Sequence, residues 1–319
     1  MRPGAARHVT TAMLLLLASC AAAYGQESRL ETRLLTLAEN DTVAVKRAGN
    51  GGQTVVIVPG LLGSDFTFRH VVPALLDAGL RVVLVDPLGT GDSGRPDNAD
   101  YSLEAQAARV EAAMRDEGVT SAIMLCQALG GTICYRLALR APELVAGIVS
   151  VNGGPAEQMA TPGLRLALRF APLIRLIGGG EQVRRQLVSG LVESAADPSW
   201  VTREVVEGFT APYRDVDLTL RTLRRMADAA EPELLAPRLS RITAPVVLLI
   251  GAANRSGTGR IDAEQVDAMR AALPRLEIVE VRESGPHIQE EAPHVVVDAV
   301  MGMLGEGWTA PDAQTTTTD

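Results

Sequence analysis

Runs of consecutive apolar residues alternate with helical segments along this chain, and this order limits the fold more than any other feature of the sequence. Half-exposed strands alternate apolar and polar residues, so continuous apolar runs predict strands that are buried on both faces. The sequence has five such runs, "QTVVIVPG", "LRVVLVDP", "SAIMLC", "VAGIVSV" and "APVVLLIG", and "LEIVEV" predicts a further strand. Apolar residues at helical spacing separate most of them, over residues 67–78, 102–117, 130–140, 262–273 and 293–304. This order predicts an α/β fold with a mostly parallel sheet flanked by helices.

One long segment interrupts the alternation. Between Ala156 and Ser240 the sequence predicts helices rich in Leu and Arg and no buried strand. We therefore predict one α/β domain in two parts, residues 31–155 and 241–305, with a helical cap inserted over residues 156–240. Apolar residues of the cap either roof an apolar pocket or pack the cap against the core; they are Leu164, Leu166, Leu168, Phe170, Leu173 and Ile174.

The two ends of the chain have compositions of their own. Residues 1–19 predict a signal peptide, in which Arg2 and Arg7 precede a short apolar run that is shorter than the ~20 residues needed to span a bilayer. "LASC", ending at Cys20, resembles the bacterial lipobox, whose Cys is lipidated, while ordinary cleavage within "CAAAYGQ" is the alternative. Both interpretations export the protein, and lipidation would anchor it through Cys20 and the tether of residues 20–30. The tail, residues 306–319, predicts disorder.

Charge and cysteine content limit the partners and the covalent structure. The formal net charge of -8 argues against a nucleic-acid partner, which favours a basic surface. Besides Cys20 the chain has only Cys126 on a predicted strand and Cys134 in the following helix. A strand and its packed helix lie about 10 Å apart, whereas a disulfide needs Cα atoms within roughly 7 Å. We therefore expect two buried free thiols.

The stretch "IMLCQALGGTICYRLALRAP", from Ile123, predicts a strand, a sharp turn and a helix. A nucleophile elbow has this layout and is written G-x-S-x-G. The five corresponding positions run from Cys126 to Gly130, with Ala128 at the centre. Gly130 and Gly131 keep the close backbone approach that such a turn needs. The sequence thus predicts an elbow without a nucleophile.

Six motifs in order resemble the α/β-hydrolase fold over residues 34–304, and the closest likeness is to its capped branch of epoxide hydrolases, haloalkane dehalogenases and C–C bond hydrolases. They are "VIVPGLLGSDFTFRHVVPAL", "VVLVDPLGTGDSGRP", "YSLEAQA", "LCQALGG", "RITAPVVLLIGAANR" and "ESGPHIQEEAP". The resemblance implies a helical cap inserted late in the sheet. It also implies a degenerate catalytic triad, because Ala128 holds the nucleophile position and Asn254 the acid position. Asn orients a His but does not neutralise the imidazolium, and that loss costs a protease about 10⁴ in kcat.

Other residues of the chain lie near the nucleophile and acid positions, but they fit these two roles poorly. Cys126 lies two positions before the elbow centre, in the strand end, and is expected to point elsewhere. Some relatives place the acid after the strand that ends at Val151, where this chain has Asn152, with Glu157 following as an expected exposed residue at the start of the cap. No metal site is predicted.

The sequence does not decide which residue holds the position of the catalytic base. Counting back from Ile288 in the "IQEE" run places Pro286 at the family's His position and His287 at the following aromatic position. A loop shorter by one residue would return His287 to the catalytic place, and otherwise it is a partly buried loop residue. His294, at the start of the last helix, is expected to face solvent. The resemblance assigns the oxyanion hole to the backbone N–H groups of Leu61 and Leu129.

These residues predict an exported, catalytically impaired or non-catalytic α/β-hydrolase-like protein of the periplasm or outer membrane. Its expected partner is a small apolar or carbonyl-bearing ligand held at Leu61 and Leu129, with no cofactor. The alternative is an active hydrolase of ester or related bonds, or a cofactor-free enzyme that uses His287 as a base in the oxyanion hole.

Overall fold

The computed structural model describes residues 30–37, 41–160, 162–169, 179–253 and 261–305. Several predictions lie outside these residues: the signal peptide, Cys20, most of the tether, the acid position Asn254 and the tail. Phe170, Leu173 and Ile174 of the cap lie outside them as well.

A single eight-stranded sheet runs through the described residues, in the order β1-β2-β4-β3-β5-β6-β7-β8. β2 pairs antiparallel with β1 and β4, and all other neighbouring strands are parallel. The predicted α/β class with a mostly parallel sheet is confirmed. The strands are β1 (Glu31–Thr36), β2 (Thr42–Ala48), β3 (Thr54–Val58), β4 (Arg81–Val85), β5 (Ala122–Gln127), β6 (Val145–Val151), β7 (Val246–Gly251) and β8 (Leu276–Val281).

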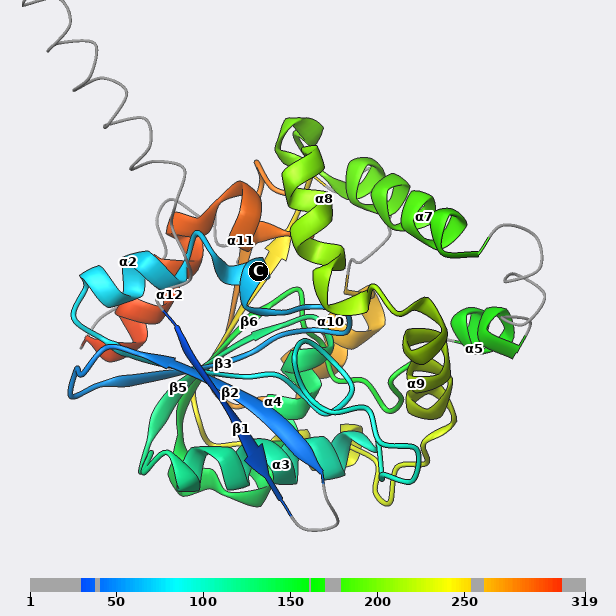
Figure 1. The fold of residues 1–319 in the computed structure, drawn as a ribbon. Coiled ribbons are helices and arrows are strands. Elements are labelled where there is room, and N and C mark those ends of the chain that lie inside the picture. Colours follow the sequence, from blue (N-terminus) through cyan, green and yellow to red (C-terminus); the bar gives the residue numbers. More distant parts are fainter. Residues whose placement is uncertain (1–29, 38–40, 161, 170–178, 254–260, 306–319) are drawn as a thin grey trace, which may run out of the picture.

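Helices cover both faces of the sheet (Figure 1). α3 (Leu103–Asp116), α4 (Leu129–Arg140) and α10 (Ala263–Ala272) pack on the face that includes Val56 and Met124. On the other face, which includes Val55 and Ile123, lie α2 (Val72–Asp77), α11 (Ile288–Glu291) and α12 (Pro293–Leu304). Each buried strand therefore contributes apolar side chains to two cores, which explains its continuous apolar sequence.

Between β6 and β7 the described residues form helices and no strand. α5 packs beside α9, where Leu168 is buried against Leu220 and Leu223, while Leu166 is 58% exposed. No helix among the described residues is long and apolar enough to cross a membrane. The helices are α5 (Pro162–Arg169), α7 (Gly179–Ser194), α8 (Arg203–Thr210) and α9 (Val216–Asp228), with the 3₁₀ helices η4 (Pro198–Trp200), η5 (Ala211–Tyr213) and η6 (Ala236–Arg241).

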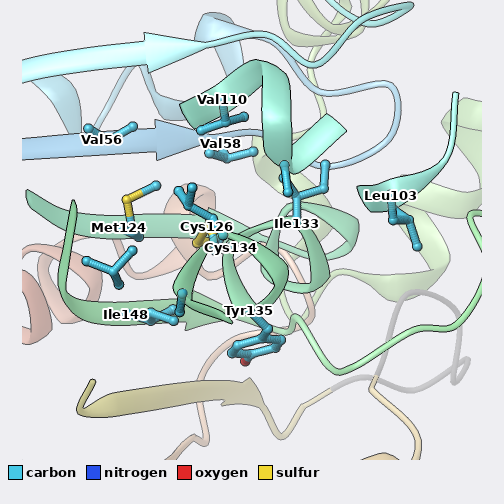
Figure 2. Close-up of a cluster of buried hydrophobic side chains, with 14 of the residues drawn as sticks. Val56, Val58, Leu103, Val110, Met124, Cys126, Ile133, Cys134, Tyr135 and Ile148 are labelled. Carbon is cyan, nitrogen blue, oxygen red and sulfur yellow. A yellow bond between two sulfur atoms is a disulfide. The ribbon is translucent and has the colours of Figure 1, made fainter. Parts of the chain in front are cut away.

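The two cysteines of the domain are joined, contrary to the expectation of free thiols. A disulfide links Cys126 in β5 to Cys134 in α4 within the buried core, with the Cα atoms 6.8 Å apart (Figure 2). The expectation was wrong because it used the average spacing of a strand and its packed helix. Here α4 starts directly after the turn that ends β5, and at Cys134, in its second turn, the helix still lies within disulfide reach of the strand.

Candidate functional site

The turn between β5 and α4 is a strained elbow with a methyl group at its centre. Ala128 has φ 47° and ψ −118°, a conformation that non-glycine residues seldom adopt. Its N–H donates to the carbonyl of Val151 at 2.9 Å, and its carbonyl accepts from the N–H of Gly131 at 2.9 Å. The elbow geometry predicted for this stretch is present, without a side chain that could act as a nucleophile.

Close backbone packing holds this elbow in place. A Cβ at Gly130 would lie 2.2 Å from the carbonyl oxygen of Val58, and a Cβ at Gly131 would lie 2.7 Å from Ser150 Oγ. Both positions therefore require glycine, as the sequence predicted. The first turn of α4 lies directly against the ends of β3 and β6, at the carboxyl edge of the sheet where α/β folds bind ligands.

A second strained turn, residues 60–63, lies beside the elbow. The Gly63 N–H donates to the Gly60 carbonyl at 2.9 Å, and Leu62 has φ 62°. The Gly60 N–H in turn donates to the side-chain oxygen of Gln127 at 3.2 Å, so the residue before Ala128 binds this turn.

The two backbone donors assigned by resemblance to the oxyanion hole remain available. No hydrogen bond within the described part of the chain engages the N–H of Leu61 or the N–H of Leu129. Leu129 is the first residue of α4, where N–H groups have no partner within the helix and the helix dipole favours negative charge. Their role as an oxygen-binding pair stays a prediction.

His287 lies among aromatic rings at the start of α11. Its imidazole is centred 5.7 Å from the ring of Trp200 and 6.2 Å from the ring of Phe209, the latter edge-on. Burial lowers the pKa of His287 to about 4, so the ring is neutral at pH 7. Its Nδ1 is buried, and no described residue forms a hydrogen bond with that atom. His294 is exposed, as expected.

The alternative acid position holds an amide that binds only backbone. Asn152, with φ 47°, donates from Nδ2 to the Pro286 carbonyl at 2.9 Å and accepts at Oδ1 from the Gly251 N–H at 3.2 Å. Both polar ends of the side chain are therefore used, and neither contacts the imidazole of His287. Sequence reasoning placed Asn152 correctly but missed that it fixes the loop before His287.

Two carboxylates close to His287 in the sequence also bind other groups. Glu291 accepts from the N–H groups of Gly285 at 2.6 Å and Ala196 at 2.7 Å, which joins the His287 loop to the cap. Glu290 pairs with Arg69 at 2.6 Å, and burial raises its pKa. Neither carboxylate therefore supplies an acid that orients the imidazole of His287. The described residues also include no group of three or more His, Cys, Asp or Glu that could hold a metal ion.

Aromatic side chains gather beside His287, although only 3% of the chain is aromatic. Phe66 and Phe209 meet edge to face at 5.8 Å, and Trp200 lies 6.3 Å from Phe209. The indole Nε1 of Trp200 is buried, with no hydrogen-bond partner among the described residues. These rings were not predicted as part of the site, although aromatic residues are so scarce in the chain that each was a usable signal.

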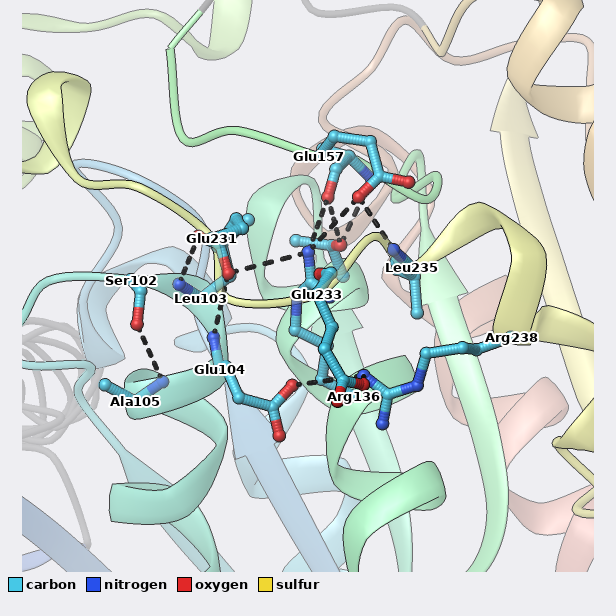
Figure 3. A network of polar contacts seen from close by, with 12 residues as sticks. Ser102, Leu103, Glu104, Ala105, Arg136, Glu157, Glu231, Glu233, Leu235 and Arg238 are labelled. Carbon is cyan, nitrogen blue, oxygen red and sulfur yellow. Dashed lines mark hydrogen bonds and ion pairs between the residues drawn. The ribbon is translucent and has the colours of Figure 1, made fainter.

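Both ends of the cap are held by one buried side chain (Figure 3). Arg136 of α4 is fully buried and lies 3.5 Å from Glu157 before the cap helices and 3.6 Å from Glu231 after them. Glu157 also accepts from the N–H groups of Leu235 and Ala236, both at 2.7 Å. Its side chain is 33% exposed, so the expectation of a plainly exposed residue was wrong: its carboxylate is occupied in holding the end of the cap.

The only lysine of the chain lies in a cluster of charges that is buried at Lys46 and Asp86 and exposed at Asp92. Lys46 Nζ is 2.5 Å from Asp65, 2.7 Å from Asp92 and 3.1 Å from Asp86. Burial alone would lower the pKa of Lys46, but its carboxylate neighbours outweigh burial and raise it. Burial raises the pKa of Asp86 to about 6. The cluster joins the segment after the 60–63 turn to the loop that follows β4.

Comparisons with known proteins agree with this architecture. A family model described as alpha/beta hydrolase fold matches residues 53–173. The chain is 23% identical over 254 residues to the uncharacterized hydrolase YugF of Bacillus subtilis (strain 168), which covers 80% of this chain and 90% of that protein. It is 25% identical over 262 residues to the sn-1-specific diacylglycerol lipase ABHD11 of Mus musculus, covering 78% and 80% respectively. The solved esterase EaEST of Exiguobacterium antarcticum superposes with a TM-score of 0.69 at 19% identity, over 86% of this chain and 100% of that chain.

Proposed function

The chain is a member of the α/β-hydrolase superfamily, and we propose that it is a catalytically impaired one that binds a small apolar or carbonyl-bearing ligand. The observation that carries this proposal is Ala128 at the centre of a strained, well-held elbow. The strain of such a turn serves to expose its central residue, and here that residue has no reactive atom. Removing the nucleophile from a serine protease costs about 10⁶ in kcat.

The surroundings of His287 support the loss of catalysis. A general base works best when its pKa lies near the operating pH, and burial holds the pKa of His287 at about 4. Such a base is neutral at pH 7 but accepts a proton weakly. The acid that should orient it is replaced by Asn254 in the sequence, and at the alternative position Asn152 binds backbone groups. These observations also count against His287 as a base acting without a nucleophile.

The binding part of the proposal rests on what the substitutions leave in place. The N–H groups of Leu61 and Leu129 belong to the backbone, so the change at residue 128 does not remove them. Trp200 and Phe209 supply apolar surface beside His287, as in ligand pockets lined by aromatic residues. Relatives named as a diacylglycerol lipase and an esterase act on acyl carbonyl groups, which supports a carbonyl-bearing ligand here.

Export is the second part of the proposal. The Cys126–Cys134 disulfide supports it, because structural disulfides persist in oxidising compartments and are rare in the cytosol. The signal-like residues 1–19 and Cys20 agree with an exported protein of the periplasm or outer membrane. Incorporation of labelled palmitate by the parent but not by Cys20→Ala would support lipidation, and an unlabelled parent would contradict it.

Catalysis is tested with a panel of short-chain p-nitrophenyl esters and the purified mature protein. The parent should turn over none of them above the buffer rate, and Ala128→Ser should gain only slow hydrolysis. Hydrolysis by the parent that is lost in His287→Ala would contradict the proposal and support the alternative of an active His-base enzyme.

Binding is tested by calorimetric titration with methyl octanoate and with methyl octyl ether, which lacks the carbonyl. If the N–H groups of Leu61 and Leu129 both bind the carbonyl oxygen, the ester should bind about thirtyfold more tightly, since two net hydrogen bonds contribute about 2 kcal/mol. Equal affinities would show an apolar pocket without carbonyl recognition, and no binding of either would contradict the ligand proposal.

A further inference from the structure

Tyr213, in the cap, contacts the turn that carries the Leu61 N–H. Its phenol donates to the carbonyl of Gly63 at 3.0 Å, and the same oxygen accepts from the N–H of Gly91 at 3.0 Å. Gly63 closes the 60–63 turn through its own N–H, and Gly91 belongs to the loop after β4. One hydroxyl group thus joins the cap to two loops at the carboxyl edge of the sheet.

The position of this phenol is itself fixed. Arg95 donates to the carbonyls of Gly91 at 2.8 Å and Pro212 at 3.1 Å, and its guanidinium lies 5.5 Å from the centre of the Tyr213 ring. Burial raises the pKa of Tyr213, which keeps the hydroxyl proton available for donation. The phenol of Tyr213 is therefore a hydrogen-bond donor in a fixed position and not a mobile surface side chain.

The turn that receives this hydrogen bond has a conformation that needs support. Leu62 has φ 62°, in the left-handed region that leucine seldom adopts. Such residues persist where the surroundings over-determine them. The turn has two side-chain supports: Gln127 binds the Gly60 N–H from the elbow side, and Tyr213 binds the Gly63 carbonyl from the cap side.

We propose that Tyr213 is a positioning residue, which holds the strained 60–63 turn so that the Leu61 N–H faces the bound carbonyl oxygen. The inference rests on the proposed ligand site, but the contact itself does not depend on a ligand. In this role Tyr213 acts through the Gly63 carbonyl, to which its phenol donates. The cap thereby completes the oxygen-binding site as well as covering it.

Hydrogen exchange tests the positioning step without any ligand. Tyr213→Phe should speed exchange of the hydrogen-bonded amides of Gly60 and Gly63 about fivefold, the factor that corresponds to losing one typical hydrogen bond. Tyr101→Phe is the matched control, because this buried phenol donates to the Pro96 carbonyl at 2.8 Å in the loop after β4 and forms no hydrogen bond with residues 60–63. An unchanged turn, or equal acceleration in the control, would overturn the proposal.

Leu62→Gly supplies a rescue that a general loosening of the protein would not show. Glycine adopts positive φ readily, so the turn should no longer need its support from the cap. Exchange in Tyr213→Phe/Leu62→Gly should return to about the parent rate, and a double variant as fast as Tyr213→Phe would overturn the proposal. The relative binding of methyl octanoate and methyl octyl ether in the same variants reports separately on the ligand site, so either idea can fail alone.

Discussion

The side-chain amide of Asn152 donates to the carbonyl of Pro286 at 2.9 Å, so the residue after β6 holds the loop that carries His287. Asn152 also accepts from the Gly251 N–H at the end of β7. A position that in some relatives holds a catalytic acid is used here to fix backbone.

Restoring a carboxylate at this position should therefore harm the protein. In Asn152→Asp the carboxylate would face the Pro286 carbonyl with no cation to pair with, and uncompensated buried charges cost about 3–5 kcal/mol. Asn152→Gly, which keeps the positive φ and loses only hydrogen bonds, should cost about 1–3 kcal/mol. Urea unfolding at pH 8 measures both. The two variants should converge near pH 4, where a protonated Asp can donate, and equal stability at pH 8 would count against this role for Asn152.

Burial of His287 makes stability depend on pH. The folded pKa, about 4, lies below the unfolded value of 6.5, so folding favours the neutral ring. This contribution is complete above about pH 6.5 and is lost as the pH falls towards 4, by about 3 kcal/mol in total. Asp86 opposes it, because burial raises the pKa of Asp86 from 3.8 to about 6, so its contribution to stability falls as the pH rises through that interval. The quantity to measure is therefore the difference in unfolding free energy between the parent and His287→Gln.

Unfolding free energies of both proteins from pH 4 to pH 7.5 check this prediction. The parent should gain stability relative to His287→Gln across that range. Parallel curves would mean that the imidazole titrates normally, and NMR titration of its Cε1 proton would then place the pKa near 6.5.

The fold could be predicted from the sequence because the inner strands of the sheet are buried on both faces, unlike the edge strands β1 and β8. The elbow could also be predicted from local sequence, because Gly130 and Gly131 indicate a close approach of the backbone. The disulfide was missed because an average spacing replaced the actual geometry at the start of α4. Contacts between distant segments, such as Tyr213 with Gly63, leave no local pattern, so the sequence alone could not predict them.

The Cys126–Cys134 disulfide should contribute measurably to stability. It closes a short loop, with a sequence separation of 8, and the chain-entropy relation gives about 2–3 kcal/mol for a loop of that length. The variant Cys126→Ala/Cys134→Ala should lose about that much in urea unfolding. Thiol titration of the mature protein, unfolded without reductant, should find neither cysteine reactive, and two reactive thiols would contradict the bond.

Arg136 should be costly to replace on its own. In Arg136→Met the Glu231 side chain, which is 4% exposed, loses its buried counter-charge, and breaking such a pair costs about 3–5 kcal/mol. Adding Glu231→Gln should recover part of that loss, because the remaining group is then neutral. A double-mutant cycle by urea unfolding measures the coupling, and effects that add within about 0.5 kcal/mol would show that the two residues act independently.

The burial of Lys46 also decides how the protein can be handled. It is the only lysine, it is 1% exposed, and its amine is enclosed by carboxylates. Amine-reactive dyes, biotin esters and lysine crosslinkers should therefore leave the folded domain unmodified, apart from any free amino terminus. If Cys20 is acylated on its amine, even that site is closed, so surface immobilisation of the native protein would have to use carboxylates or an added tag.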